Sequence, residues 1–376
     1  MKDVCTFYSG GTPSSSNKDY YTGDIPFIRS GELHESCTEL FISKDGLNNS
    51  SAKIVHKGDL LLALYGATSG DIAISQIEGA INQAILCINT EQSKEYIKAV
   101  WQKHVQKILQ TYLQGGQGNL SADIVKNISF YFALSKEQDK LANFIRLLDE
   151  RIATQNKIID KLQSLIKGLV DSLLENPSWE KVYLCSFMQF YSTNSLSWEQ
   201  LSYSNGNVRN MHYGLIHGFQ MSLIDSTLLP RILPNYLPKQ YTVCQDGDVV
   251  FADASEDTNE IGKAIEFSNT INVKTVCGLH TIHGRDIKQN TILGFKGFAF
   301  NSRYFHDQVR RLAQGTKVYS ITAKNLLSCF VYIPDVIKQE NIVRLLNAYE
   351  ENLSLNRTLL NKYEIQKQYL LQQMLI

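Results

Sequence analysis

The sequence of 376 residues has no apolar stretch long enough to cross a bilayer. Its clearest apolar run, residues 60–64, is far short of the ~20 residues required. No basic segment leads into an apolar stretch near Met1, so we expect no signal peptide. The seven cysteines are widely spaced and form no C-x-x-C motif. We therefore expect reduced thiols, a cytoplasmic location and no membrane partner.

The chain also lacks net charge, because 37 Lys and Arg residues balance 37 Asp and Glu residues. A protein that binds DNA by itself through counterion release usually carries an excess of positive charge. Any nucleic-acid binding by this chain is therefore expected to use local patches, or charge supplied by a partner.

Two catalytic motifs are missing. The seven prolines are never adjacent, which excludes the Asn/Asp-Pro-Pro-aromatic motif of amino-methyltransferases, and no G-x-x-x-x-G-K-[ST] sequence forms a P-loop. Glu256 and Asp257 are neighbouring carboxylates, but no matching acid or base stands at a characteristic spacing from them. We expect a protein that is not an enzyme, with no catalytic residues and no cofactor.

Cys277-x-x-His280-x-x-His283 has the residue types of a metal site. On one strand, however, the three side chains would point to different faces, and no fourth ligand is evident. We expect no metal here. A hydrolase or metalloenzyme that uses this region is a remote alternative, and it predicts bound metal in stoichiometric amount.

What is present is ordinary globular composition over a length that favours two or more domains. Alternating steps of four and three predict one apolar stripe on a long helix, at Leu141, Ile145, Leu148, Ile152, Ile159, Leu162, Ile166, Leu169 and Leu173. The pattern recurs 201 residues later at Ile342, Leu346, Tyr349, Leu353, Asn356, Leu360, Tyr363, Lys367, Leu370 and Met374.

Two stripes of this length, ~50 Å each, favour an antiparallel coiled coil between the helices. The alternative is that each helix packs on its own neighbouring domain. Each stripe has a polar residue near its middle, Gln155 in the first and Asn356 in the second. We expect these two to meet at a pseudo-two-fold axis and fix the register; the alternative is that both face solvent.

The segments before the two helices also align, at offsets that rise along the chain. Tyr8-Ser9 matches Tyr191-Ser192 at an offset of 183, Gly58-Asp59 matches Gly247-Asp248 at 189, and Gly70 matches Gly262 at 192. A rising offset is what loop insertions in an old duplication produce. We predict an α+β chain of two mostly-β domains alternating with two long helices, with boundaries at 1–134, 135–178, 179–334 and 335–376.

Within the domains, turns followed by buried strands are predicted at 58–64 and 247–252, and strands that lead into the long helices at 124–134 and 326–333. Helices are predicted near 91–110 and 301–313. Met1 is expected to lie inside the first strand. Gly-rich polar loops lie between these elements, at 10–14, 66–70 and 115–119.

Several of these runs together carry a family resemblance. In the first domain they are Gly10-Gly11-Thr12-Pro13-Ser14, Gly23-Asp24-Ile25-Pro26-Phe27-Ile28, Gly58-Asp59-Leu60-Leu61, residues 64–70, Asn82-Gln83-Ala84 and residues 117–128. In the second they are Tyr213-Gly214, residues 251–257, Ile261-Gly262-Lys263, Gly278-Leu279-His280-Thr281 and residues 311–320. Over nearly its whole length the chain resembles the DNA-specificity (S) subunit of type I restriction-modification systems. The lead-in Trp179-Glu180-Lys181-Val182 has no counterpart before the first domain.

The resemblance implies a non-catalytic subunit whose partners are double-stranded DNA, two methyltransferase (M) subunits and, in the full complex, restriction (R) subunits. Each target-recognition domain would recognise one half of a bipartite target. The helix pair would set the spacing between the halves and dock the methyltransferases. The alternative is a coiled-coil scaffold that binds only proteins.

Polar loops beside the sheets are the candidate DNA contacts, because Asn and Gln suit adenine, Arg suits guanine, Glu suits cytosine N4, and hydroxyls suit phosphates. In the first domain the candidates are Thr12, Ser14, Arg29, Ser30, Tyr65, Thr68, Asn82, Gln83, Gln117 and Asn119. In the second they are Tyr213, Ser255, Glu256, His280, Thr281, His283, Gln314, Thr316, Lys317 and Tyr319. The alternative is that these loops are ordinary surface turns.

Overall fold

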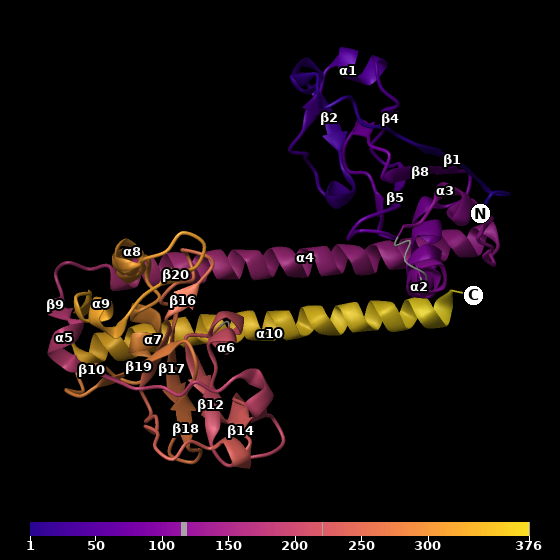
Figure 1. Ribbon diagram of the computed structural model, residues 1–376. Coiled ribbons are helices and arrows are strands. Elements are labelled where there is room, and N and C mark those ends of the chain that lie inside the picture. The colour runs from indigo at the N-terminus through magenta and orange to yellow at the C-terminus, as the bar shows by residue number, and fades with distance from the viewer. Residues whose placement is uncertain (114–118, 220, 376) are drawn as a thin grey trace. The chain divides into compact units, whose positions relative to one another are not determined.

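The computed structural model describes residues 1–113, 119–219 and 221–375, and the chain forms two compact units (Figure 1). Unit 1 contains Met1–Asn156 and Thr358–Ile376, and unit 2 contains Lys157–Arg357. Two long helices, α4 (Ser135–Leu174) and α10 (Val336–Met374), each contribute to both units. Among the described residues, no helix is both long and apolar enough to cross a membrane.

Unit 1 contains two four-stranded sheets. The first is antiparallel and has the order β1 (Cys5–Ser9), β8 (Ile85–Thr90), β5 (Leu60–Ala63), β6 (Ile72–Ile74). The second has the order β3 (Phe41–Ile42), β2 (Ile25–Ile28), β7 (Gly79–Ile81), β4 (Lys53–Val55), with β2 and β7 parallel. Its other helices are α1 (Lys44–Asn48), α2 (Lys94–Leu113) and α3 (Ala122–Asn127).

Unit 2 contains a five-stranded sheet in the order β10 (Met188–Tyr191), β19 (Thr281–Asp286), β15 (Val249–Ala252), β17 (Ala264–Ser268), β13 (Leu223–Asp225). A four-stranded sheet has the order β11 (Leu201–Ser202), β14 (Arg231–Ile232), β12 (Arg209–Met211), β18 (Thr275–Cys277). Two further pairs are β16 (Ala254–Ser255) with β20 (Tyr319–Ser320), and β9 (Glu180–Tyr183) with β21 (Phe330–Ile333). Its helices are α5 (Leu184–Phe187), α6 (Tyr213–Gly218), α7 (Phe295–Ala299), α8 (Arg303–Leu312) and α9 (Ala323–Leu327).

The two units repeat one topology. The order β1-β8-β5-β6 recurs as β10-β19-β15-β17, and the parallel pair β2–β7 recurs as β12–β18. The register recurs too, since Leu61 lies opposite Cys87 and Val250 lies opposite His283. The offset rises from 183 residues between β1 and β10 to 201 between α4 and α10. The predicted duplication is therefore confirmed.

Two equivalent glycines show why the repeat preserves them. Gly70 and Gly262 both have positive φ, 87° and 72°. A Cβ atom at Gly70 would lie 2.8 Å from Val105 Cγ2 of α2, and one at Gly262 would lie 2.6 Å from Val309 Cγ1 of α8. In each unit a helix therefore packs so closely on this turn that only glycine fits both the backbone and the space.

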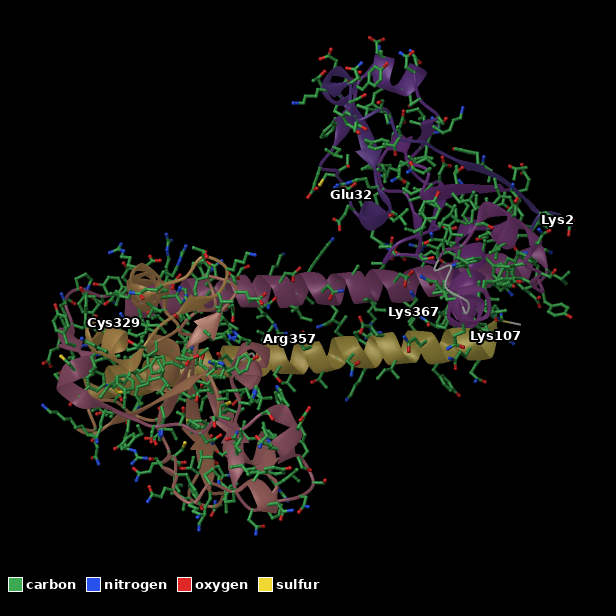
Figure 2. The ribbon with its side chains drawn as sticks, viewed as in Figure 1. Lys2, Glu32, Lys107, Cys329, Arg357 and Lys367 are labelled. Atoms are coloured by element: carbon green, nitrogen blue, oxygen red, sulfur yellow. The ribbon has the colours of Figure 1, made fainter. Side chains whose placement is uncertain are left out.

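The long helices use their predicted apolar faces, and both alternatives for their packing hold. In unit 1, Ala142 and Ile145 of α4 share a core cluster with Leu371 of α10 and with Tyr96 of α2. The Asp149 carboxylate of α4 forms two ion pairs, with Oδ2 3.0 Å from Lys98 Nζ of α2 and Oδ1 2.5 Å from Lys367 Nζ of α10. Figure 2 labels Lys367. Each helix thus packs on its own unit and on the other helix.

In unit 2 the other ends of the two helices share a cluster, in which Val170 and Leu174 lie with Ile342 and Leu346. In unit 1 the first turns of α4 contact the last turns of α10. In unit 2 the last turns of α4 contact the first turns of α10. The two helices are therefore antiparallel within each unit. One predicted stripe residue fails, because Met374 is 39% exposed. The apolar residues of the stripe recur on average every 3.5 residues, whereas an α-helix has 3.6 residues per turn. The stripe therefore drifts around the helix, and by its end Met374 no longer lies on the buried face.

Several local predictions are confirmed and two are wrong. The strands predicted at 58–64 and 247–252 are β5 and β15, both fully buried, and the predicted helices at 91–110 and 301–313 are α2 and α8. Residues 124–134 are not a strand: α3 covers the first part, and no strand follows it. In unit 2 the matching strand β21 forms against β9, and residues 128–134 have no such ladder partner among the described residues. The first strand begins at Cys5, so Met1 lies outside it.

Candidate nucleic-acid interface

Three predicted residues of unit 1 meet at the ends of its strands. The Thr12 hydroxyl donates to Gln83 Oε1 at 2.5 Å, and the Tyr65 hydroxyl donates to the backbone carbonyl of Gln83. Thr12 and Gln83 are exposed and Tyr65 is half-buried. We call Thr12, Tyr65 and Gln83 the first polar cluster. It presents hydroxyl and amide groups, which can donate to or accept from base edges and phosphates.

Neighbouring candidates border this cluster. The Leu120 amide donates to the Leu64 carbonyl at 2.8 Å, which brings exposed Asn119 near Tyr65. Asn82 accepts from the Ala84 amide at 3.1 Å and so holds the turn that carries Gln83. Thr68 lies half-buried in the turn at 66–70, and exposed Ser14 contacts Ser16.

Arg29 and Ser30 form a separate corner. The Arg29 guanidinium donates to Glu32 Oε1 at 3.0 Å and to Glu39 Oε2 at 2.6 Å. Burial raises the pKa of Glu32, but the hydrogen bond from Arg29 and others outweigh it and hold that pKa at about 2. Arg29 could contact guanine only by exchanging these carboxylates for the base. Gln117 and the loop around it lie outside the described residues.

In unit 2 the candidates Tyr213 and His280 belong to a chain of aromatic rings. Ring centroids are 4.5 Å apart between Trp198 and His212, 4.6 Å between His212 and Tyr213, and 5.4 Å between Tyr213 and His280. Trp198 is 44% exposed. We call these four residues the aromatic chain. His212 is buried within the chain, whereas the exposed rings of Trp198 and His280 offer apolar faces and polar tips together.

The β16–β20 ribbon extends the aromatic chain. His280 Nδ1 lies 3.3 Å from Asp253 Oδ1, and Ser255 pairs with Tyr319 across the ribbon. Glu256 is exposed beside it. His280 has a φ of 55°, an uncommon left-handed conformation for a residue with a Cβ atom. Strained positions of this kind concentrate at functional sites, which supports a role for this loop.

A hairpin carries the remaining candidates. Gln314 and Ser320 exchange two backbone hydrogen bonds, of 3.0 and 2.8 Å, and close the turn that exposes Thr316 and Lys317. Gly315 has a φ of 137°, and a Cβ atom there would lie 1.9 Å from the Val318 carbonyl oxygen. The exposed hydroxyl and ammonium of Thr316 and Lys317 are suited to phosphate contact.

Two candidates have to be dropped. Thr281 is 5% exposed and its hydroxyl donates to the Gly278 carbonyl at 2.6 Å. The His283 side chain is 1% exposed and its Nε2 lies 2.7 Å from Asp248 Oδ2. Both residues belong to β19, a strand with neighbours on both sides. Neither side chain has a surface to offer to DNA.

Sequence reasoning missed Trp198, His212 and Asp253. Burial and then the nearby His280 lower the pKa of His212, so its ring is neutral at pH 7 and its Nδ1 accepts from the Gly214 amide. Burial raises the pKa of Asp253, and His280 opposes that rise. The signal in the sequence was weak: Trp198 is one of three tryptophans, and only the fold brings it to Tyr213.

The Cys277-x-x-His280-x-x-His283 motif, where we expected no metal, is divided by the fold. Cys277 ends β18 and His283 lies in β19, so the assumption of a single strand was wrong. His280 turns toward Asp253, whereas Cys277 and His283 lie with Cys244, a residue that the sequence did not associate with them. The ligand atoms of these three buried residues all lie within 4.8 Å of one another.

The proposed register residues belong to different units, Gln155 to unit 1 and Asn356 to unit 2. Gln155 is 6% exposed, which excludes the solvent-facing alternative for this residue. Asn356 is half-buried and donates to the Asn352 carbonyl at 2.8 Å. Their meeting at a pseudo-two-fold axis stays a prediction.

The fold is a duplication with polar loops at equivalent strand ends, which defines a two-module protein. Residues 1–164 match the family described as "Type I restriction modification DNA specificity domain". The specificity subunit of the type I restriction enzyme MjaVIII of Methanocaldococcus jannaschii is 21% identical, over 97% of this chain and 88% of the relative. The MjaIX specificity subunit of the same organism is 27% identical, over 43% of this chain and 40% of the relative.

Solved structures agree on the fold. An S subunit of a type I restriction-modification system from M. genitalium has a TM-score of 0.60 at 12% identity, covering 100% of this chain and 94% of that one. A chain of another type I R-M system, solved to explain complex assembly and conformational transition, has a TM-score of 0.56 at 14% identity, covering 99% and 97%. The first 164 residues thus match the DNA-specificity domain family, and over nearly its whole length the chain is similar to specificity subunits of type I restriction-modification systems.

Proposed function

We propose that this chain is the DNA-recognition subunit that directs a type I adenine methyltransferase and restriction complex to a bipartite target. The observation that carries the proposal is the duplication: one topology occurs twice, and each copy presents polar loops from equivalent strand ends. Two similar modules in one chain suit a target made of two half-sites. The subunit would itself be non-catalytic.

Each unit would recognise one half-site with different chemistry. Unit 1 offers amides and hydroxyls of the first polar cluster, which suit base edges. Unit 2 offers the aromatic chain together with Lys317 on its hairpin. Because the chain has no net charge, methyltransferase subunits would supply much of the attraction for phosphates. We propose two M subunits, docked on the helix pair, and R subunits in the full complex.

The direct test is to sequence methylated adenines in host DNA with and without this gene. We expect deletion to abolish methylation of one bipartite motif and to leave other methylated motifs unchanged. Restoring the gene in trans should restore that motif alone. If the methylome is unchanged and no adenine methyltransferase co-purifies with the chain, the protein-only scaffold is the better account.

A second prediction separates the half-sites. Trp198→Ala should weaken binding of the assembled methyltransferase to DNA by about tenfold to a hundredfold, because losing one contact to a base pair of the duplex costs ~1–3 kcal/mol. The selectivity should relax only in the half-site of unit 2. Gln83→Ala should affect only the other half-site. Binding to DNA libraries randomised in one half-site measures both effects.

The matched control for Trp198→Ala is Tyr203→Ala, which removes an aromatic ring that is 62% exposed in the same unit and lies outside the aromatic chain. We expect it to leave both affinity and selectivity unchanged. Equal loss of affinity for all sequences in the Trp198→Ala complex, with selectivity intact, would assign Trp198 a structural or phosphate-positioning role instead.

A further inference from the structure

The duplication allows one buried layer to be compared between the two units. Ile81 of β7 pairs with Ile28, and Cys277 of β18 pairs with Met211 at the equivalent register position. Cys87 lies opposite Leu61, and His283 lies opposite Val250 in the equivalent strands. The fold therefore places Cys277 where unit 1 has Ile81, and His283 where unit 1 has Cys87.

The third position follows from the same strands. In unit 1, Val55 pairs with Gly79 of β7. In unit 2, the Cys244 amide donates at 2.8 Å to Thr275, which occupies the equivalent place in β18. Val55, Ile81 and Cys87 of unit 1 are all fully buried and share one hydrophobic cluster. Unit 1 thus fills this layer with two aliphatic side chains and one thiol, whereas unit 2 has two thiols and an imidazole there.

The geometry of the three side chains fits a metal ion. Cys244 Sγ and Cys277 Sγ are 3.6 Å apart, and all three ligand atoms lie within 4.8 Å of one another. Two thiolates on one tetrahedral zinc, each at ~2.3 Å, are separated by ~3.8 Å. Cys244, Cys277 and His283 are 2%, 1% and 0% exposed.

The imidazole of His283 is oriented as a ligand. Its Nε2 lies 2.7 Å from Asp248 Oδ2, while its buried Nδ1 has no hydrogen-bond partner among the described residues. Asp248 in turn accepts from Arg285, at 2.8 Å to Oδ1 and 2.6 Å to Oδ2. A carboxylate that fixes the other ring nitrogen is the usual second partner of a metal-bound histidine. A buried ring nitrogen left without a partner otherwise costs about 1–3 kcal/mol, whether it is a donor or an acceptor.

We propose that Cys244, Cys277 and His283 bind one thiophilic metal ion, with zinc as the expected occupant and Cu(I) as the other candidate of the same ligand preference. Binding would release the two thiol protons to solvent and leave a neutral Nδ1 on the metal. Zn²⁺ with two thiolates carries no net charge, and Asp248 is balanced by Arg285, so the layer can stay buried. Three protein ligands leave one position of a tetrahedral ion for a non-protein ligand.

The ion would connect the two sheets of unit 2. Cys277 lies at the end of β18 in the four-stranded sheet, and His283 lies in β19 of the five-stranded sheet. The loop between them carries His280 of the aromatic chain. A metal at this point would fix both ends of a candidate DNA-contacting loop, a role that goes beyond the proposed function and can be tested without DNA.

The experiment uses the purified full-length chain, reduced and treated with a chelator, then given Zn²⁺, Co²⁺ or Cu(I) alone. We expect one equivalent of metal after desalting, and thiolate-to-cobalt charge-transfer bands with Co²⁺. The variant Cys244→Val/Cys277→Ile/His283→Cys copies the layer of unit 1. It should fold and bind no metal. Cys277→Ser alone should weaken binding at least a hundredfold.

Two cysteines provide matched controls. Cys87→Ser alters the equivalent buried layer of unit 1, and Cys329→Ser alters a buried cysteine of unit 2 that lies outside the cluster (Figure 2). Both should bind metal like the unchanged chain. Stoichiometric Cu(I) with no retained zinc would support the site and assign it to copper.

The proposal fails if the folded, reduced chain retains none of these metals, or if the triple variant retains as much as the unchanged chain. It also fails if peptide mapping finds Cys244 and Cys277 joined in a disulfide and the reduced chain takes up no metal. None of these outcomes depends on DNA binding, so they leave the proposed function untouched.

Discussion

Replacing Lys296 with Met is expected to lower the free energy of unfolding of unit 2 by about 3–5 kcal/mol at neutral pH. Lys296 Nζ lies 3.1 Å from Glu266 Oε1, and the two side chains are only 3% and 0% exposed. Glu266 Oε2 also accepts from the Gly297 amide at 2.8 Å. Removing the ammonium would leave a buried carboxylate with backbone amide donors alone and no opposite charge.

The loss should depend on pH in a definite direction. Burial already raises the pKa of Glu266 above its usual value, with Lys296 opposing the rise, and removing Lys296 would raise that pKa further. A carboxyl group whose pKa is higher in the folded than in the unfolded chain destabilises the fold above that pKa. The penalty should therefore shrink as the pH falls through the new pKa and Glu266 is protonated in the folded chain.

Hydrogen exchange of the β17 and α7 amides at several pH values measures the effect locally, which avoids assuming that two units unfold together. Lys274→Met, at an exposed lysine of the same unit, is the control and should change little. The double variant Glu266→Gln/Lys296→Met should recover most of the loss, because a neutral amide still accepts from Gly297. A single Lys296→Met variant as stable as the unchanged chain would show that Glu266 is neutral in the native protein.

The long helices and the repeat could be predicted from the sequence because their signals are local. Steps of three and four give a helical stripe whatever its partner is. Matches such as Gly70 with Gly262 survive because helix α2 or α8 leaves no room for a Cβ atom there. The strand predicted at 124–134 failed for the opposite reason, since the matching segment of unit 2 is a strand only where β9 pairs with it.

The site residues were harder to predict because they depend on pairing between distant strands. Cys244 and Cys277 are 33 residues apart, and only the contact between the segment before β15 and β18 brings them together. Polar residues within strands were equally ambiguous. Thr281 and His283 had the residue types of DNA contacts, but β19 has neighbours on both sides and its side chains there face the interior.

The largest functional effect is expected from lengthening the two long helices together. Both pass from one unit to the other at defined places, α4 after Asn156 and α10 after Arg357. Inserting seven residues at both places adds ~10.5 Å to each helix and rotates one end relative to the other by only ~20°. If the helices set the spacing between half-sites, the gap in the methylated motif should lengthen, by at most about three base pairs at ~3.4 Å each.

The half-sites themselves should not change, because neither insertion touches the first polar cluster or the aromatic chain. Methylation of the original motif should fall below detection, and a new motif with the same two halves and a longer gap should replace it. Insertion in α4 alone is the control: it shifts the apolar stripe of one helix against the other, so we expect poor assembly and no new motif. If the paired insertion altered the bases of either half-site, or left the gap unchanged, the spacing would have to be set by the units and the DNA rather than by α4 and α10.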